Sequence, residues 1–160
     1  MSNTGLEIFD TTLQETHHWL RIVMAELETD SRHVAFSALR AGLHALRDRI
    51  GPVNAVHLGA QLPMLLRGAY YEGWRAGSTP SAGRHIEDFL DRVDANLPRN
   101  SHVTARAAAR ATFSALVECL DAGEVEKVTK LLPRELAPLW PERWTDSEFS
   151  TSSASWGFGH

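Results

Sequence analysis

The sequence predicts an all-α protein: a helical bundle built from two tandem repeats of about four helices each, followed by a disordered or extended C-terminal tail. Three observations lead to this fold class. Apolar residues recur every three or four positions, glycines and prolines divide these runs into short segments, and the second half of the chain repeats the first. Residues 16–74 align with residues 86–144 at a constant offset of 70, and 16 of these 59 positions are identical.

The identical positions are mostly apolar residues, small residues and helix stops, so the duplication predicts shared packing more than a shared reactive site. Two units of about 60 residues would each be marginal alone, and we therefore expect them to share one core. The predicted organisation is a single domain over residues 1–144, with repeats at 6–74 and 84–144 joined by a linker at 75–83. Residues 145–160 form the tail.

The first helix is predicted to run to about Glu28, because its apolar residues fall three or four positions apart. Asp30 or Ser31 can accept a backbone hydrogen bond at the start of the second helix. Small residues line the inner stripe of that second helix and of its counterpart, so we expect the pair at the centre of the bundle. The two stripes are Ala35, Ala38, Leu39, Gly42, Leu43, Leu46 and Ile50, and Ala105, Ala108, Ala109, Thr112, Phe113, Leu116 and Leu120.

Gly51 is expected to end the second helix, and Pro52 to open a short third helix that reaches about Gln61. Pro63 then breaks the helix, because proline lacks a backbone donor and disfavours helical geometry in the residue before it. A fourth short helix is predicted to carry three side chains inward: Leu65, Leu66 and Tyr70. The second half repeats this order, with a break at Pro133 and a last helix shortened by prolines: Pro138 and Pro141.

Composition and charge narrow the function classes. The formal net charge is −4, which argues against binding to nucleic acid. The only cysteine, Cys119, excludes an internal disulfide and suits a reducing cytoplasm. No signal-peptide pattern opens the chain, and no apolar run approaches the ~20 residues that a membrane span needs. We therefore expect a soluble protein of the cytoplasm.

Several short motifs resemble a bacterial family of unknown function, DUF2267. They are the run Leu39–Ile50 (LRAGLHALRDRI), Ala60–Pro63 (AQLP), Leu66–Gly68 (LRG) and Tyr70–Trp74 (YYEGW). The resemblance covers about residues 9–141, includes the second Leu-Pro at 132–133, and leaves the tail outside. It implies a duplicated all-helical domain of bacterial origin with no established activity and no catalytic residues to carry over.

A metal site is the first chemical hypothesis that the sequence raises. Glu15 and His18 stand one helical turn apart, in the Glu-x-x-His spacing of di-metal helical bundles, and the offset of 70 pairs them with His85 and Asp88. Two helices could thus offer two imidazoles and two carboxylates to a pair of metal ions. Against this, the other helices offer no further carboxylates on their inner stripes. Glu15 and His18 also lie beside the apolar stripe, which favours a surface position.

Four arginines suggest a second hypothesis, a binding site for an acidic or phosphorylated ligand: Arg40, Arg47, Arg106 and Arg110. Arg40 and Arg110 are the only basic pair that the duplication retains. Guanidinium groups hold carboxylates and phosphates with paired hydrogen bonds. The structural alternative is that the retained arginines bond helix ends and fix the register between the units.

The tail suggests the third hypothesis. Serine and threonine dominate residues 145–155, and the chain then ends in a segment that contains Trp156, Phe158 and His160. Trp and Phe are side chains that anchor peptides in a partner's pocket. No phosphate loop, nucleophile elbow or His-Glu-x-x-His motif is present, so the sequence favours a non-catalytic protein. The leading hypothesis is an adaptor that docks to a larger protein assembly through its tail, with self-association left open.

Overall fold

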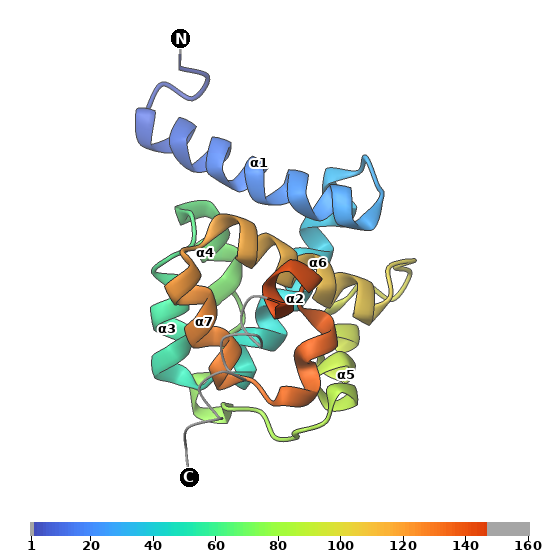
Figure 1. The fold of residues 1–160 in the computed structure, drawn as a ribbon. Coiled ribbons are helices and arrows are strands. Elements are labelled where there is room, and N and C mark those ends of the chain that lie inside the picture. Colours follow the sequence, from blue (N-terminus) through green and yellow to red (C-terminus); the bar gives the residue numbers. More distant parts are fainter. Residues whose placement is uncertain (1, 147–160) are drawn as a thin grey trace.

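Figure 1 shows the fold as a computed structural model, which describes residues 2–146. Within this range the chain forms helices and no β-strand, so the predicted all-α class is confirmed. The elements in chain order are α1 (Glu7–Leu27), α2 (Arg32–Arg49), α3 (Pro52–Gly59), α4 (Met64–Tyr71), the 3₁₀ helix η1 (Ala76–Ser78), α5 (Ile86–Asn96), α6 (Ala105–Cys119), α7 (Ala122–Leu131) and the 3₁₀ helix η2 (Arg134–Leu139).

Helices α2 and α6 lie at the centre of the bundle, as the small-residue stripes predict. They pack against each other, α1 lies across both of them, and α5 packs on α2 from the other half of the chain (Figure 1). A single hydrophobic core therefore contains residues from both halves. Ser31 begins α2 by accepting a hydrogen bond from the backbone N–H of Val34, at 3.2 Å. Ser31 is one of the two residues, with Asp30, that the sequence predicts as the cap of this helix.

The two proline corners separate the short helices. Pro63 directly precedes α4, and Pro133 directly precedes η2. The short helix predicted after Pro133 is present as the 3₁₀ helix η2, but Pro138 lies inside it instead of ending it. The prediction for Leu65 is wrong: its side chain is exposed at the start of α4, whereas Leu66 and Tyr70 are fully buried.

Two tryptophans at equivalent positions of the predicted repeats differ in their hydrogen bonding. Trp144 Nε1 donates to Thr129 Oγ1 at 3.0 Å. In the alignment of the two halves, the residue that corresponds to Thr129 is Gly59, which has no side-chain acceptor. The buried Nε1 of Trp74 accordingly has no hydrogen-bond partner among the described residues. A Cβ atom at Gly59 would lie 2.2 Å from the hydroxyl of Tyr71, which occupies that space. The duplication itself stays a prediction.

The longest helix, α1, has no full counterpart. It spans 21 residues, whereas α5 spans 11 and begins at the residue paired with Thr16. The first turns of α1 thus extend beyond the part of the helix that α5 matches, and its N-terminal end projects at the edge of the bundle (Figure 1). None of the helices described is both long and apolar enough to span a membrane.

Candidate functional site

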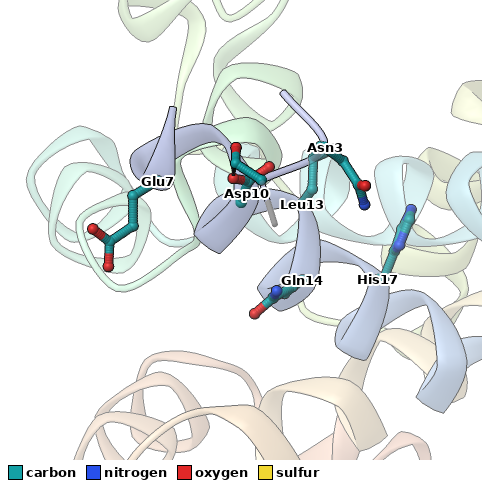
Figure 2. A pocket seen from close by; sticks show the side chains of 7 residues that line it. Asn3, Glu7, Asp10, Leu13, Gln14 and His17 are labelled. Atoms are coloured by element: carbon teal, nitrogen blue, oxygen red, sulfur yellow. Dashed lines mark hydrogen bonds between the residues drawn. The ribbon is translucent and has the colours of Figure 1, made fainter. Parts of the chain in front are cut away.

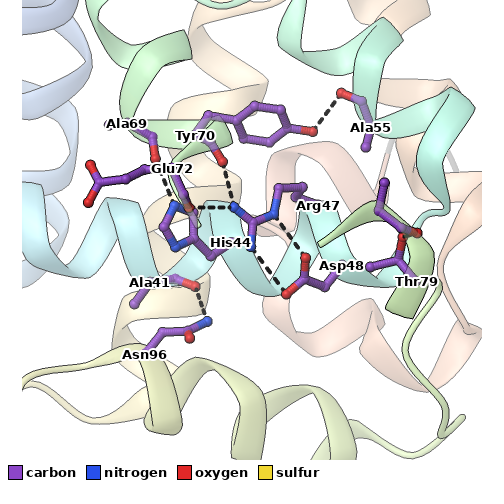
Figure 3. Close-up of polar contacts among 11 residues, drawn as sticks. Ala41, His44, Arg47, Asp48, Ala55, Ala69, Tyr70, Glu72, Thr79 and Asn96 are labelled. Atoms are coloured by element: carbon purple, nitrogen blue, oxygen red, sulfur yellow. Dashed lines mark hydrogen bonds and ion pairs between the residues drawn. The ribbon is translucent and has the colours of Figure 1, made fainter. Parts of the chain in front are cut away.

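A buried polar network joins α2 to the end of α4 (Figure 3). At its centre is Arg47, whose residue surface is only 4% exposed. Its Nη1 donates to the carbonyl oxygens of Tyr70, at 2.8 Å, and of Glu72, at 3.0 Å. Its Nε and Nη2 donate to the two carboxylate oxygens of Asp48, at 2.9 and 3.3 Å. Arg47 therefore supplies donors to backbone carbonyls that the end of α4 would otherwise leave unpaired.

His44 and Arg40 extend this network along α2, each one helical turn from its neighbour. His44 Nε2 lies 2.7 Å from the carbonyl oxygen of Ala69, a distance that fits donation by a neutral imidazole. Burial lowers the pKa of His44, and the nearby Arg47 and Arg40 lower it further, although the bond to Ala69 acts in the opposite direction. The imidazole is consequently neutral near pH 7 and serves as a fixed donor.

Arg40 and Glu72 form an ion pair at the exposed edge of the network, with Nη2 2.8 Å from Oε1. Glu72 directly follows the last residue of α4. The ion pair therefore links α2 to the end of α4 through side chains, in addition to the hydrogen bonds that Arg47 and His44 make to the backbone there. Deeper inside, the hydroxyl of Tyr70 donates to the carbonyl oxygen of Ala55 in α3, at 2.7 Å. Burial raises the pKa of this hydroxyl, which is thus un-ionised. Apart from the bonds between Arg47 and Asp48, which lie within α2, these contacts fasten one helical segment to another.

The four arginines proposed as ligand groups occupy two different situations. Arg40 and Arg47 bind α4, whereas Arg106 and Arg110 are exposed on α6. Within residues 2–146, no hydrogen bond or ion pair joins the second pair to the first. The buried partner set of Arg47 could not be read from the sequence, because the carbonyls that it binds lie 23 and 25 residues along the chain.

The four residues of the metal hypothesis lie on α1 and at the start of α5. Glu15 and His18 are exposed, as their place beside the stripe predicts. Asp88 accepts a hydrogen bond from the backbone N–H of His85, and His85 Nδ1 lies 3.1 Å from Glu135 Oε2. That contact with Glu135 raises the pKa of His85. Residues 2–146 contain no group of three or more His, Cys, Asp or Glu side chains placed to hold a metal ion. The metal hypothesis stays a prediction.

A hollow of about 420 Å³ lies beside the first turns of α1 (Figure 2). Its lining comes from the N-terminal segment and one face of the helix: Ser2, Asn3, Glu7, Asp10, Leu13, Gln14 and His17. Asp10 accepts hydrogen bonds from Ser2 Oγ and from the backbone N–H and hydroxyl of Thr4. These bonds, led by the one from Ser2, lower the pKa of Asp10. The carboxylate therefore holds the N-terminal segment against the helix.

Cys119, the only thiol in the chain, lies at the end of α6 and is partly buried. Burial raises its pKa to about 12, so the thiol is protonated and a poor nucleophile near pH 7. The tail residues predicted to bind a partner, Trp156, Phe158 and His160, lie outside the residues that the structure describes.

Comparison with known proteins gives one family match. A family model described as "Uncharacterized conserved protein (DUF2267)" matches residues 16–147. No curated protein matches the chain. The family match begins at Thr16, in the middle of α1, and so includes the network around Arg47 but leaves out the projecting first turns of that helix.

Proposed function

Because the chain belongs to the DUF2267 family, whose description names no activity, we propose a function from its own residues: a non-catalytic interaction module that acts as an adaptor in the bacterial cytoplasm. In this proposal the helical body is a rigid platform, and the protein docks to a larger protein assembly through Trp156, Phe158 and His160. Trp and Phe anchors of this kind supply much of the affinity of peptide docking.

The proposal rests on the contacts that Arg47 and His44 make. A buried guanidinium and a buried imidazole are groups that could bind an anion or transfer a proton. Here both point their donors at backbone carbonyls of α4 and of Glu72, the residue that follows it, at 2.7 to 3.0 Å, and thereby hold two helices together. These polar groups support a structural role for the body, which leaves binding to its surface and to the tail.

Deleting residues 147–160 tests the proposal. We expect the truncated chain to keep its helical circular dichroism and its melting temperature, and to lose the partner that co-purifies with the full chain. A Trp156→Ala/Phe158→Ala variant should behave in the same way, whereas the matched Ser152→Ala/Ser153→Ala variant should retain the partner. Undiminished co-purification after the deletion would contradict docking through the tail.

A further inference from the structure

One face of α1 passes beyond the edge of the core. The helix is buried at Thr12, Thr16 and Trp19. Ile8 and Phe9 precede Thr12 by four and three residues, so they continue this buried face by one more turn toward the N-terminus. Their residue surfaces are nevertheless 60% and 47% exposed. The other helices do not reach far enough to cover them.

Two further apolar side chains stand beside this turn, at the start of α4. Met64 and Leu65 are 43% and 50% exposed. Leu65 N donates to Thr12 Oγ1 at 2.9 Å, which fixes the first turn of α4 against α1 one turn from Phe9. We name these four side chains, Ile8, Phe9, Met64 and Leu65, the α1–α4 apolar end. Figure 1 shows α4 below the N-terminal half of α1.

The formal charges that the first 20 residues place beside the α1–α4 apolar end are acidic. Residues 1–20 include Glu7, Asp10 and Glu15 but no lysine or arginine. Glu15 follows Ile8 by seven residues, or two helical turns, and therefore flanks the same side of α1. The nearest cation of α4, Arg67, donates its Nε and Nη2 to backbone carbonyls, those of Gly59, Ala60 and Leu62. Arg67 keeps its positive charge, but these bonds direct its guanidinium toward the end of α3, and the charges that α1 itself places beside Ile8 and Phe9 are acidic.

From this combination we infer that the α1–α4 apolar end binds a basic amphipathic helix of another protein. Its apolar face packs on Ile8, Phe9, Met64 and Leu65, and its Lys or Arg side chains face Glu7 and Glu15. Methionine suits such a surface because its unbranched side chain adapts to different partners. Opposite charges at the rim select the partner and speed association. The inference rests on the proposed function, since it adds a second docking surface to an interaction module.

The acidic residues of α1 also argue against other binding partners at this surface. A second copy that presented its own α1 would bring Glu7 and Glu15 against the same acidic residues. The tail of this chain, residues 145–160, contains Asp146 and Glu148 and no lysine or arginine. Anionic lipids and nucleic acids are repelled for the same reason. A basic segment of a different protein is the occupant for which both the apolar contacts and the charges are favourable.

Fluorescence anisotropy with a designed peptide tests the inference. The probe is a labelled 18-residue helix of leucine and lysine at amphipathic spacing, titrated with the full chain, and a leucine and glutamate helix of the same pattern is its control. We expect binding of the lysine peptide that weakens as salt is added, and at least ~10-fold weaker binding of the glutamate peptide. Equal binding of the two peptides would overturn the inference.

Surface variants locate the binding. Phe9→Gln and Leu65→Gln each change an exposed side chain, so the fold should survive, and we expect each to weaken binding of the lysine peptide ~10-fold. Glu7→Gln/Glu15→Gln should remove most of the salt dependence. Val53→Gln is the matched control, because Val53 is an apolar residue of α3 that is 69% exposed outside the α1–α4 apolar end. Equal loss in the control, or no loss in Phe9→Gln and Leu65→Gln, would overturn the assignment.

The tail-deleted chain separates this inference from the proposed function. We expect deletion of residues 147–160 to leave peptide binding within ~2-fold of the full chain, because the peptide contacts only α1 and α4. Loss of the co-purified partner with retained peptide binding supports both proposals. If the full chain binds the peptide but captures no protein partner, the proposed function is contradicted and the inference about the α1–α4 apolar end stands. Loss of peptide binding on tail deletion overturns the inference.

Discussion

Gly42 of α2 and Thr112 of α6 touch at the point where the two central helices cross. A Cβ atom at Gly42 would lie 2.0 Å from Thr112 Oγ1, so only glycine leaves room for the threonine. Thr112 Oγ1 in turn donates to the carbonyl oxygen of Ala108, at 2.8 Å. The two residues are also partners in the sequence repeat, at positions 42 and 112 with the offset of 70. The predicted repeats therefore meet at this pair.

Gly42→Ala should destabilise the protein by about 2 kcal/mol, because the added methyl group overpacks the crossing of α2 and α6 and outweighs the gain in helix propensity. Thermal or urea unfolding followed by circular dichroism measures this loss. Gly68→Ala in α4 is the control, since the added Cβ would have no atom within 4 Å beyond the neighbouring residues and the backbone of its own helix. That control should be neutral or stabilising by up to about 1 kcal/mol. Equal effects would disprove the close contact.

Exchanging the two side chains tests the same contact as a pair. Gly42→Thr alone places two threonines at one crossing, whereas Gly42→Thr/Thr112→Gly restores one threonine facing one glycine. We expect the double variant to be more stable than Gly42→Thr by at least about 1 kcal/mol, a coupling typical of residues in contact. A double variant no more stable than the single one would show that the two positions are independent.

Arg47→Met should cost about 3 kcal/mol of stability. The methionine fills similar space but leaves the carbonyl oxygens of Tyr70 and Glu72 without their donor and Asp48 without its cation. Arg106→Met is the control, because Arg106 is exposed on α6, and it should change stability by less than about 0.5 kcal/mol. If Arg47→Met hardly changes the free energy of unfolding in denaturant, the structural role of Arg47 is wrong and the ligand-binding role suggested by the sequence is favoured.

Thr12→Val should lower stability by about 1 kcal/mol. Pro63 precedes α4 and offers no capping side chain, so the hydroxyl of Thr12 supplies the acceptor for the first turn of α4 from a different helix. Valine keeps the shape and removes only the acceptor. Thr11→Val, at the exposed neighbouring position, is the control. Faster hydrogen exchange at the amide of Leu65 in the Thr12 variant alone would locate the effect.

His44 and His85 should titrate on opposite sides of pH 6.5. Burial holds the pKa of His44 below that value, and the hydrogen bond to Glu135 raises the pKa of His85. Because the unfolded chain takes up the His44 proton first, the contribution of neutral His44 to stability is full above pH 6.5 and is lost as the pH drops toward the folded pKa. NMR titration of the imidazole nitrogens measures both groups, and His44→Gln should remove the part of the fall that His44 causes. An unshifted His44 would contradict its burial.

The helices could be predicted from sequence because their causes are local. The three and four spacing of apolar residues, the cap at Ser31 and the breaks at Pro63 and Pro133 act within a few residues, and each appears where it was expected. Leu65 shows the limit of this reasoning. Its apolar character predicts burial, but α4 begins at the edge of the bundle, and which side chains the edge leaves uncovered depends on the tertiary arrangement.

The candidate sites depend on contacts between distant parts of the chain. Arg47 looks like a surface or ligand-binding arginine in the sequence, because nothing in the local pattern shows that its partners are carbonyls of α4. The exposure of Phe9 follows from the extension of α1 past its neighbours, which no local pattern shows. The sequence therefore shows which side chains are available for a site, but it does not show what they contact or whether they are exposed.

Native mass spectrometry of the full chain, isolated from its own cells, tests the central claim of a protein-binding module most directly. The account predicts a stoichiometric complex with another protein, reduced in the Trp156→Ala/Phe158→Ala and Phe9→Gln/Leu65→Gln variants and unchanged in Val53→Gln. A chain that instead carries a metal ion or small molecule and no protein partner would contradict it.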